Sequence, residues 1–252
     1  MLQTVRELIR SNRLLNFNLV DRDRWVRSHA AQLAPGSRVL DLGAGSAPYR
    51  TAFAHCEYRS QDFTQLKPDQ LRHGGYSAID YVCDAAALPV PDASFDAVLS
   101  TEMLEHVPEP IQVVREMGRI LKPNGLLILT APLGSGIHQE PFHFYGGYTP
   151  YWYQRFLSEA GFDRIHIEPN AGSLRFFSQE SIRFLRSTRP FALRMPLPAE
   201  VIWAPLWLLS LPVLGILVPL ACAALDPFDR ERRFTVGYHV TARRTAVGSG
   251  RA

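Results

Sequence analysis

A short stretch with two closely spaced glycines, residues 39–48, most constrains the fold of this chain. It reads Val-Leu-Asp-Leu-Gly-Ala-Gly-Ser-Ala-Pro, so that apolar residues lead into Asp41 and then into Gly43 and Gly45. This order is typical of a buried parallel strand that enters a tight turn, where glycine lets the backbone approach a ligand because it has no Cβ and tolerates positive φ. The dinucleotide fingerprint G-x-G-x-x-G is incomplete, because its third glycine would fall at Pro48.

The next two expected strands, at 57–61 and 79–83, are each followed by an acidic residue. Asp62 follows the first of them, about twenty residues after the glycine turn, where nucleotide-binding α/β folds hold a ribose diol. Asp84 follows the second and is itself followed by Ala85. Further apolar segments predict strands at 95–100, 126–130, 162–168 and 234–243 and helices at 111–121 and 151–160. Strands that alternate with helices predict a mostly parallel sheet covered on both faces.

These motifs, with Glu105-His106 and the turn Lys122-Pro123-Asn124-Gly125, resemble those of the class I S-adenosylmethionine-dependent methyltransferases of the type 11 group. The resemblance covers roughly residues 36–170 and resumes at the last expected strand. It implies a Rossmann-like, doubly wound α/β fold with a mostly parallel, seven-stranded sheet whose last strand is antiparallel. It also implies S-adenosylmethionine as the cofactor. The family often has a third glycine where this chain has Ala47.

The same resemblance assigns roles in cofactor binding to residues at the ends of the first strands. Asp62 is expected to accept hydrogen bonds from both ribose hydroxyls, and Asp84 to lie beside the adenine amino group. Asp41 is expected to orient the glycine turn or to bind the cofactor ammonium. The alternative for Asp62 and Asp84 is that both are solvated acids at strand ends. The predicted cofactor set is Asp41, Gly43, Gly45, Asp62, Asp84 and Ala85.

A long segment after the fifth expected strand, residues 131–150, is rich in glycine, histidine and aromatic residues. Long irregular loops in compact domains are usually functional or disordered, and the aromatic residues argue against disorder. If the methyl acceptor is a hydroxyl, its proton must leave, and histidine is the base best suited to neutral pH. We therefore expect His143 and His138 as catalytic residues, with His106 as a further candidate. The alternative for His143 and His106 is a structural role.

The composition indicates where in the cell the protein is expected and which partners are not expected. The three cysteines lie far apart and form no C-x-x-C pair, so we expect neither a disulfide framework nor a metal site, and we expect a cytoplasmic location. Residues 1–13 carry charges throughout and do not resemble a secretory signal. The net charge is only +3, and no basic run is interleaved with aromatic residues, so no nucleic-acid partner is expected.

An uncharged apolar run of 25 residues, 201–225, is long enough to be a transmembrane candidate. Five arginines precede it between residues 173 and 200, and Trp203 and Trp207 lie near its start, a composition suited to a membrane surface. The strands expected on either side belong to one sheet, so a single crossing would place them on opposite sides of the bilayer. We therefore expect the run to fold back as an apolar hairpin that contacts the inner face of the membrane. A hairpin buried in the protein or in a dimer is the alternative.

The expected organisation is a helical leader at 1–35, a methyltransferase core at 36–172 and 234–243, an Arg-rich apolar helical insertion at 173–233 and a flexible tail at 244–252. We expect methyl transfer to a hydroxyl of a small-molecule or glycan acceptor, lipid-linked and at the membrane surface. The alternatives are methylation of a quinone or other isoprenoid lipid, and a methyltransferase-like scaffold without activity. The intact acids and glycines favour an enzyme over a scaffold.

Overall fold

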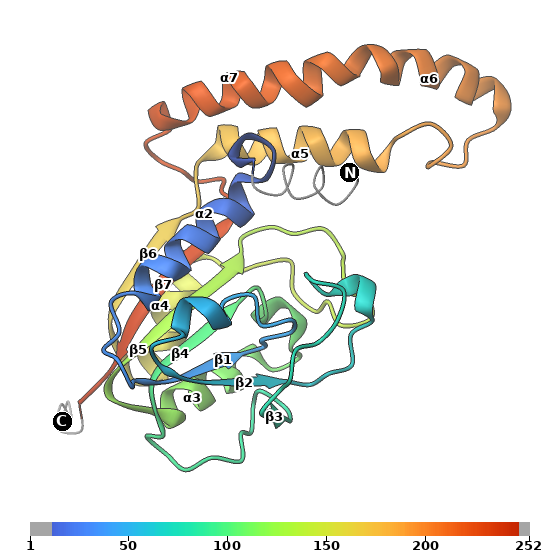
Figure 1. The fold of residues 1–252 in the computed structure, drawn as a ribbon. Coiled ribbons are helices and arrows are strands. Elements are labelled where there is room, and N and C mark those ends of the chain that lie inside the picture. The colour runs from blue at the N-terminus through green and yellow to red at the C-terminus, as the bar shows by residue number, and fades with distance from the viewer. Residues whose placement is uncertain (1–11, 247–252) are drawn as a thin grey trace. The chain divides into compact units, whose positions relative to one another are not determined.

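The computed structural model describes residues 12–246 and divides the chain into two compact units (Figure 1). The first, called the sheet unit below, comprises Arg22–Glu168 and Gly237–Ala252. The second, called the helical unit, comprises Met1–Asp21 and Pro169–Val236. The whole of the expected insertion at 173–233 belongs to the helical unit. Part of the expected leader, residues 1–11, and most of the expected tail, residues 247–252, lie outside the described residues.

The sheet unit is built on a seven-stranded sheet with the strand order β3-β2-β1-β4-β5-β7-β6. β1 pairs in parallel with β2 and β4, whereas β5 pairs antiparallel with β7. This arrangement confirms the predicted Rossmann-like sheet with an antiparallel last strand. The strands are β1 (Arg38–Leu42), β2 (Glu57–Asp62), β3 (Tyr81–Val82), β4 (Phe95–Thr101), β5 (Leu121–Pro132), β6 (Phe162–Pro169) and β7 (Gly237–Arg244).

Two apolar clusters cover the sheet, one on each face. One contains Val26 and Ala30 from the end of α2 (Arg13–Ala30), packed with residues of β1, β4 and β5. The other contains side chains of α3 (Pro110–Ile120) and α4 (Pro150–Glu159). Thr149 begins α4 as the predicted N-cap, since its side chain accepts a hydrogen bond from the backbone N–H of Trp152.

The crossovers between the first strands differ from the expected pattern. They carry only short 3-10 turns, η1 (Arg50–Phe53) and η2 (Pro68–Gln70), rather than full helices. β3 is also shorter than the strand expected at 79–83. The reason lies in Asp80, whose carboxylate accepts hydrogen bonds from the Ser60 backbone N–H and hydroxyl, both at 2.9 Å. The Asp80 backbone N–H still donates to the Ser60 carbonyl at 3.1 Å, but the Ser60 N–H bonds to a side chain and not to the backbone of the edge strand.

The helical unit contains α5 (Ser173–Ser187) and a long helix that lies beside it (Figure 1). The long helix joins α6 (Leu197–Pro212), the π-helical segment η4 (Val213–Leu217), α7 (Val218–Leu225) and η5 (Asp226–Phe228) into 32 continuous residues. By length and composition it is able to cross a membrane. Its most apolar 18-residue window has a mean hydropathy of 2.4, and 11% of that window is buried.

The expected hairpin within 201–225 is therefore wrong in its position, because this run is a single helix and the hairpin is formed with α5. The indole N–H groups of Trp203 and Trp207 donate to backbone carbonyls at the end of α5, at 2.7 and 3.0 Å. The π-helical segment begins directly after Pro212. A π-helical turn is wider than an α-helical turn, so a proline that removes one hydrogen bond does not end the helix.

Two aspartates join the two ends of the helical hairpin. The Asp226 carboxylate accepts hydrogen bonds from the backbone N–H groups of Gly172 and Arg175, the latter at 2.9 Å. Asp229 accepts one from the N–H of Ser173 at 2.7 Å. The first turn of α5 is thus capped by acids from the far end of the hairpin, where a negative charge also complements the helix dipole.

Candidate functional site

The glycine turn after β1 has the backbone geometry that the sequence predicts. Gly43 has φ of +74°, and a Cβ placed there would lie 2.4 Å from Cγ of Met103. Gly45 has φ of +54°, also in the left-handed region. Ala47 has φ of +46°, which explains why the family often uses glycine at this position. The turn therefore requires glycine at Gly43 for two reasons, the dihedral angle and the contact with Met103.

Asp62 lies at the end of β2 and is hydrogen-bonded to the glycine turn. Its side chain is buried, Oδ2 accepts a hydrogen bond from the Gly45 N–H at 2.9 Å, and Oδ1 accepts one from the Thr64 N–H at 3.0 Å. An ionised carboxylate offers about four acceptor positions, so positions remain for a pair of hydroxyl donors. The residues present thus fit a ribose diol beside the turn.

Asp41 is buried beneath the same turn, where the Tyr58 hydroxyl donates a hydrogen bond to its Oδ2. Burial raises the pKa of Asp41 to about 7, against the stabilising hydrogen bond of Tyr58, and the charge of Asp62 adds to the increase. The contact with Tyr58 supports the first of the two expected roles of Asp41, which is to orient the turn.

Asp84 and Ala85 follow β3 and differ in exposure. Asp84 is exposed, and its Oδ1 accepts a hydrogen bond from the Ala86 N–H at 2.9 Å. Ala85 is buried in the larger apolar cluster. This arrangement holds a carboxylate at the surface next to an apolar wall, which suits an adenine ring and its amino group.

Gln61 connects these two parts of the site and was not predicted from the sequence. Its Oε1 accepts a hydrogen bond from the Gly43 N–H at 3.2 Å, and its Nε2 donates to the Cys83 carbonyl at 2.6 Å. The side chain therefore joins the glycine turn to the segment that carries Asp84. In the sequence Gln61 is an ordinary polar residue of a strand, and nothing distinguishes it.

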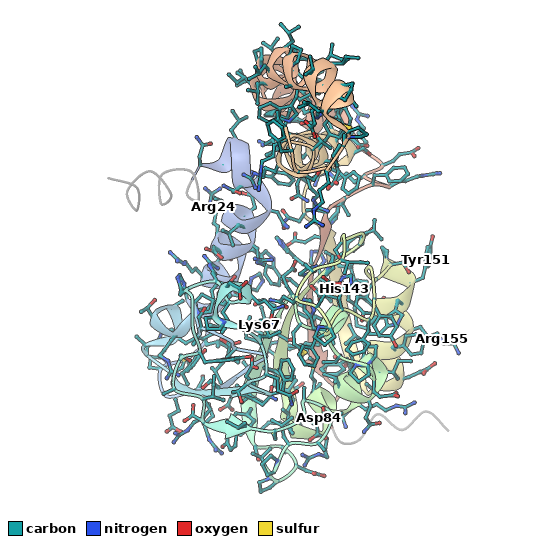
Figure 2. All side chains as sticks on the ribbon, turned by 90° about the vertical axis from the view of Figure 1, so that its right-hand side faces the viewer. Arg24, Lys67, Asp84, His143, Tyr151 and Arg155 are labelled. Carbon is teal, nitrogen blue, oxygen red and sulfur yellow. The ribbon has the colours of Figure 1, made fainter. Side chains whose placement is uncertain are left out.

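The predicted histidines His138 and His143 lie together on the loop after β5, and the structure brings His106 to them. His106 ends η3 (Leu104–His106), which follows β4. The ring centroid of His138 lies 4.7 Å from the ring centroid of His106 and 4.7 Å from that of His143. The rings of His106 and His143 are 5.7 Å apart. Figure 2 shows His143 well separated from Asp84, as an extended cofactor with an acceptor at one end would require.

Hydrogen bonds hold this loop against η3. The Tyr148 hydroxyl donates to the Leu104 carbonyl at 2.7 Å, and the Phe144 N–H donates to the Glu105 carbonyl at 2.9 Å. The loop also meets the segment after β2, since the Gln139 side-chain amide donates to the Gln70 carbonyl at 2.9 Å. The loop is thus an ordered wall of the site.

Two glutamates lie near the histidines, and in the part of the chain that the structure describes only one of them, Glu102, forms an ion pair with an arginine. Burial lowers the pKa of His106 to about 4, and it raises the pKa of Glu105 well above its usual range, an effect that the charge of Glu102 reinforces. Burial and the neighbouring His138 also lower the pKa of His143. Glu102 has a cationic partner, because Nη1 of Arg22 lies 3.0 Å from its Oε2. The lowered pKa values favour the neutral imidazole of His106 and of His143, whose ring then keeps a free lone pair.

Comparison with known proteins identifies the family. The sequence profile of the family described as "Methyltransferase domain" matches residues 40–129. An "Uncharacterized methyltransferase" of Mycobacterium bovis (strain BCG / Pasteur 1173P2) is 30% identical over 207 residues, which are 76% of this chain and 76% of the relative. The chain belongs to the class I S-adenosylmethionine-dependent methyltransferases. S-Adenosylmethionine is the cofactor of this family.

One more curated relative and one solved structure are similar to this methyltransferase. A demethylmenaquinone methyltransferase of Lysinibacillus sphaericus (strain C3-41) is 34% identical over 124 residues, 45% of this chain and 53% of the relative. The solved structure of an S-adenosylmethionine-dependent methyltransferase from Archaeoglobus fulgidus has the same fold, with a TM-score of 0.55, 14% identity and coverage of 96% of this chain and 98% of that one. The chain spans about half the length of several curated relatives that it matches.

Replacement of Asp62 tests the predicted ribose contact of the methyltransferase. Loss of a bidentate contact that leaves polar groups unpaired costs about 1–3 kcal/mol, so Asp62→Ala should weaken S-adenosylmethionine binding about ten- to a hundredfold. Isothermal titration calorimetry measures the affinity, and Asp163→Ala, at an exposed acid of β6, is the control. Equal affinity in both variants contradicts the assignment.

The raised pKa of Asp41 predicts a pH-dependent stability of the cofactor-free methyltransferase. Because the folded-state pKa is about 7 and the ordinary value is 3.8, the folded state binds more protons than the unfolded state between these values. This contribution to stability is complete below about pH 4 and is lost as the pH rises through about 7. It amounts to up to about 4 kcal/mol, since one pKa unit corresponds to about 1.4 kcal/mol.

Asp41→Asn keeps an acceptor for Tyr58 but cannot titrate. Urea unfolding at pH 4.5 to 8 should therefore show the wild type losing stability relative to this variant as the pH rises. Asp163→Asn provides the control for a surface acid. A wild-type-minus-variant difference that does not change with pH contradicts the raised pKa.

Proposed function

We propose that the chain transfers the methyl group of S-adenosylmethionine to a hydroxyl of a membrane-associated acceptor, a lipid-linked glycan or small molecule. The observation that carries this proposal is the cluster of His106, His138 and His143 on the acceptor side of a site whose other end has the acids and glycines of a cofactor site. A neutral amine attacks a methyl group with its own lone pair, whereas a hydroxyl needs a base that removes its proton as the methyl group is transferred. Imidazole accepts protons near neutral pH.

S-Adenosylmethionine supplies a sulfonium methyl group whose carbon–sulfur bond breaks as the new carbon–oxygen bond forms. The chain's task is to hold the acceptor oxygen in line with that bond, and such positioning accounts for much of the rate in reactions of this kind. His143 or His138 accepts the hydroxyl proton. His143 is held for this role by Ser135, whose hydroxyl oxygen lies 3.1 Å from Nε2. The Ser135 hydroxyl lies 3.2 Å from the Gly146 carbonyl, to which it donates.

A continuous apolar stripe supports a membrane-associated acceptor. Six of the exposed apolar residues of the long helix recur at intervals of three and four between positions 202 and 220, which places these six on one face. They are Ile202, Leu206, Leu209, Val213, Ile216 and Leu220. An uncovered stripe of this length is unusual in a monomeric soluble protein and marks an interaction surface. We propose that it lies against the inner face of the membrane.

The long helix and α5 form a groove between them that suits a lipid head group. A groove of about 350 Å³ lies between the two helices, with Trp207 and Leu211 on one side and Arg186 and Arg189 on the other. An apolar lining beside two guanidinium groups complements the acyl chain and the anionic head group of a phospholipid. The helical unit thus offers both an exposed apolar stripe and an apolar groove beside basic residues.

Methylation of a quinone or another isoprenoid lipid is the second candidate function. The observation that favours it is the 34% identity to a demethylmenaquinone methyltransferase over 45% of this chain. Such an acceptor also carries a ring hydroxyl, so the histidines would have the same task. It differs from the first candidate in solubility, because the whole acceptor partitions into lipid.

Labelled-methyl transfer distinguishes the candidates. The protein is incubated with methyl-labelled S-adenosylmethionine and with three separate fractions: water-soluble glycans, lipid-linked glycans and an isoprenoid quinone fraction. The proposal predicts label in the lipid-linked glycans. Label in the quinone fraction alone supports the second candidate, and binding of S-adenosylmethionine without transfer to any fraction supports a scaffold.

His143→Ala should reduce the rate of this labelling about 10²- to 10⁴-fold, the usual contribution of general base catalysis. The affinity for S-adenosylmethionine should remain unchanged, because the cofactor acids lie elsewhere in the site. His166→Ala, at an exposed histidine of β6, is the control. A loss of cofactor affinity that accounts for the whole loss of rate would place His143 on the cofactor instead.

Charges placed on the apolar stripe test membrane contact. Ile202 and Leu209 are 65% and 72% exposed, so Ile202→Glu/Leu209→Glu leaves packing against α5 intact. Each apolar side chain contributes about 1.5–3 kcal/mol when it is buried, so sedimentation with phosphatidylglycerol vesicles should weaken at least about tenfold. Tyr151→Glu, at an 85% exposed residue of α4, should have no effect. A wild type that ignores vesicles and forms a dimer that the double variant disrupts assigns the stripe to a protein interface.

A further inference from the structure

We propose that Glu105, His106 and His138 bind a divalent transition-metal ion of the zinc class. One ligand atom from each residue, a carboxylate oxygen or a ring nitrogen, lies within 4.8 Å of the other two. The three residues come from two separate elements, η3 after β4 and the loop after β5. Two imidazoles and one carboxylate form the ligand set of many catalytic zinc sites, in which a further position stays open.

Hydrogen bonds fix both imidazoles in the tautomer that a metal requires. Nδ1 of His106 lies 2.6 Å from the Phe142 carbonyl, and Nδ1 of His138 lies 2.9 Å from the Gly136 carbonyl. A carbonyl oxygen only accepts, so the proton of each ring must be on Nδ1. Nε2 of each ring then carries the lone pair. A backbone carbonyl on the distal nitrogen is the usual outer-shell partner of a metal-bound histidine.

Glu105 supplies the negative charge, and the described residues leave one of its oxygens without a partner. Its side chain is 1% exposed, and among the described residues Oε2 forms no hydrogen bond. The nearby Arg22 pairs with Glu102, not with Glu105. Oε1 of Glu105 lies 3.7 Å from Nε2 of His106, so the carboxylate is directed to the lone pair of the ring. A cation shared by these two atoms would compensate a buried carboxylate that is otherwise costly.

The chemistry of the ligands selects the class of ion. Imidazole nitrogen suits zinc, cobalt, nickel and iron, whereas magnesium and calcium prefer sets made of oxygen alone. His138 is exposed, so a coordination position toward solvent stays accessible. His143, whose ring lies 4.7 Å from that of His138, is not one of the three ligands, so it stays free to accept the hydroxyl proton when an ion occupies His138.

This site differs from the expectation that the chain holds no metal. That expectation rests on the spacing of the cysteines, which take no part. His106 and His138 are separated by 32 positions, and no short motif joins them. Only the contact between η3 and the loop after β5 brings them together.

Titration of the untagged protein with Zn²⁺ and with Co²⁺, in the absence of S-adenosylmethionine and acceptor, tests the proposal. We expect one equivalent of either ion to bind, with the visible absorption of Co²⁺ in a nitrogen and oxygen ligand field, and a rise in the melting temperature with Zn²⁺. His138→Ala, at an exposed position, should weaken binding at least about tenfold, and Glu105→Gln should do the same. Because no methyl transfer is involved, a negative result leaves the proposed function unaffected.

His166→Ala is the matched control, because Nε2 of His166 also lies near a glutamate, 3.9 Å from Glu168, but without a third ligand. This variant should bind both ions as the wild type does. Melting of the metal-free proteins shows whether each variant is folded. The proposal is overturned if the wild type binds neither ion, or if the folded His138→Ala and Glu105→Gln variants bind them as tightly as the wild type.

Discussion

The site depends on the attachment of the glycine turn to the end of β2. The backbone N–H groups of Gly43 and Ala44 donate to the Gln61 carbonyl at 3.0 and 2.9 Å, and the N–H of Gly45 donates to the Asp62 carboxylate. Met103 closes the turn from the other side and directly precedes η3. The path of the turn therefore fixes both Asp62, which is predicted to bind the cofactor, and the element that carries Glu105 and His106, so any side chain at Gly43 disturbs both.

The sequence predicts this part of the molecule well because its information is local. When a strand ends in an acid about twenty residues after a glycine turn, parallel pairing of the two strands brings that acid close to the turn. The structure places Asp62 in this position, hydrogen-bonded to Gly45. Gln61 and Asp80 were missed for a physical reason. Their side chains add hydrogen bonds to backbone groups of neighbouring segments, and neither hydrophobic periodicity nor turn composition indicates such bonds.

For the helical unit, the sequence predicts which residues are apolar but not the path of the chain. Composition correctly isolates the apolar run at 201–225, but its path depends on the cost of prolines and on distant caps. We expected the run to fold back on itself, whereas the helix widens into a π-helical segment after Pro212 and continues. The return of the chain is provided by α5, whose first turn is capped by Asp226 from 54 positions away. No local pattern connects a capping aspartate with a helix so remote in sequence.

Buried carboxylates show where the fold departs from what stability alone would favour. The buried Asp41 has a hydroxyl partner in Tyr58, and the partly buried Glu102 has a cationic partner in Arg22 together with the Thr130 hydroxyl at 2.9 Å. Glu105 is as deeply buried as Asp41, yet burial lowers the pKa of its neighbour His106, so this ring gains nothing from the charge of Glu105 unless a proton or a cation is shared. A fold kept only as a scaffold would be more stable with an apolar residue at this position. A buried acid beside three histidines, with one oxygen that has no hydrogen-bond partner among the described residues, is therefore better explained by chemistry at this place than by the needs of the fold.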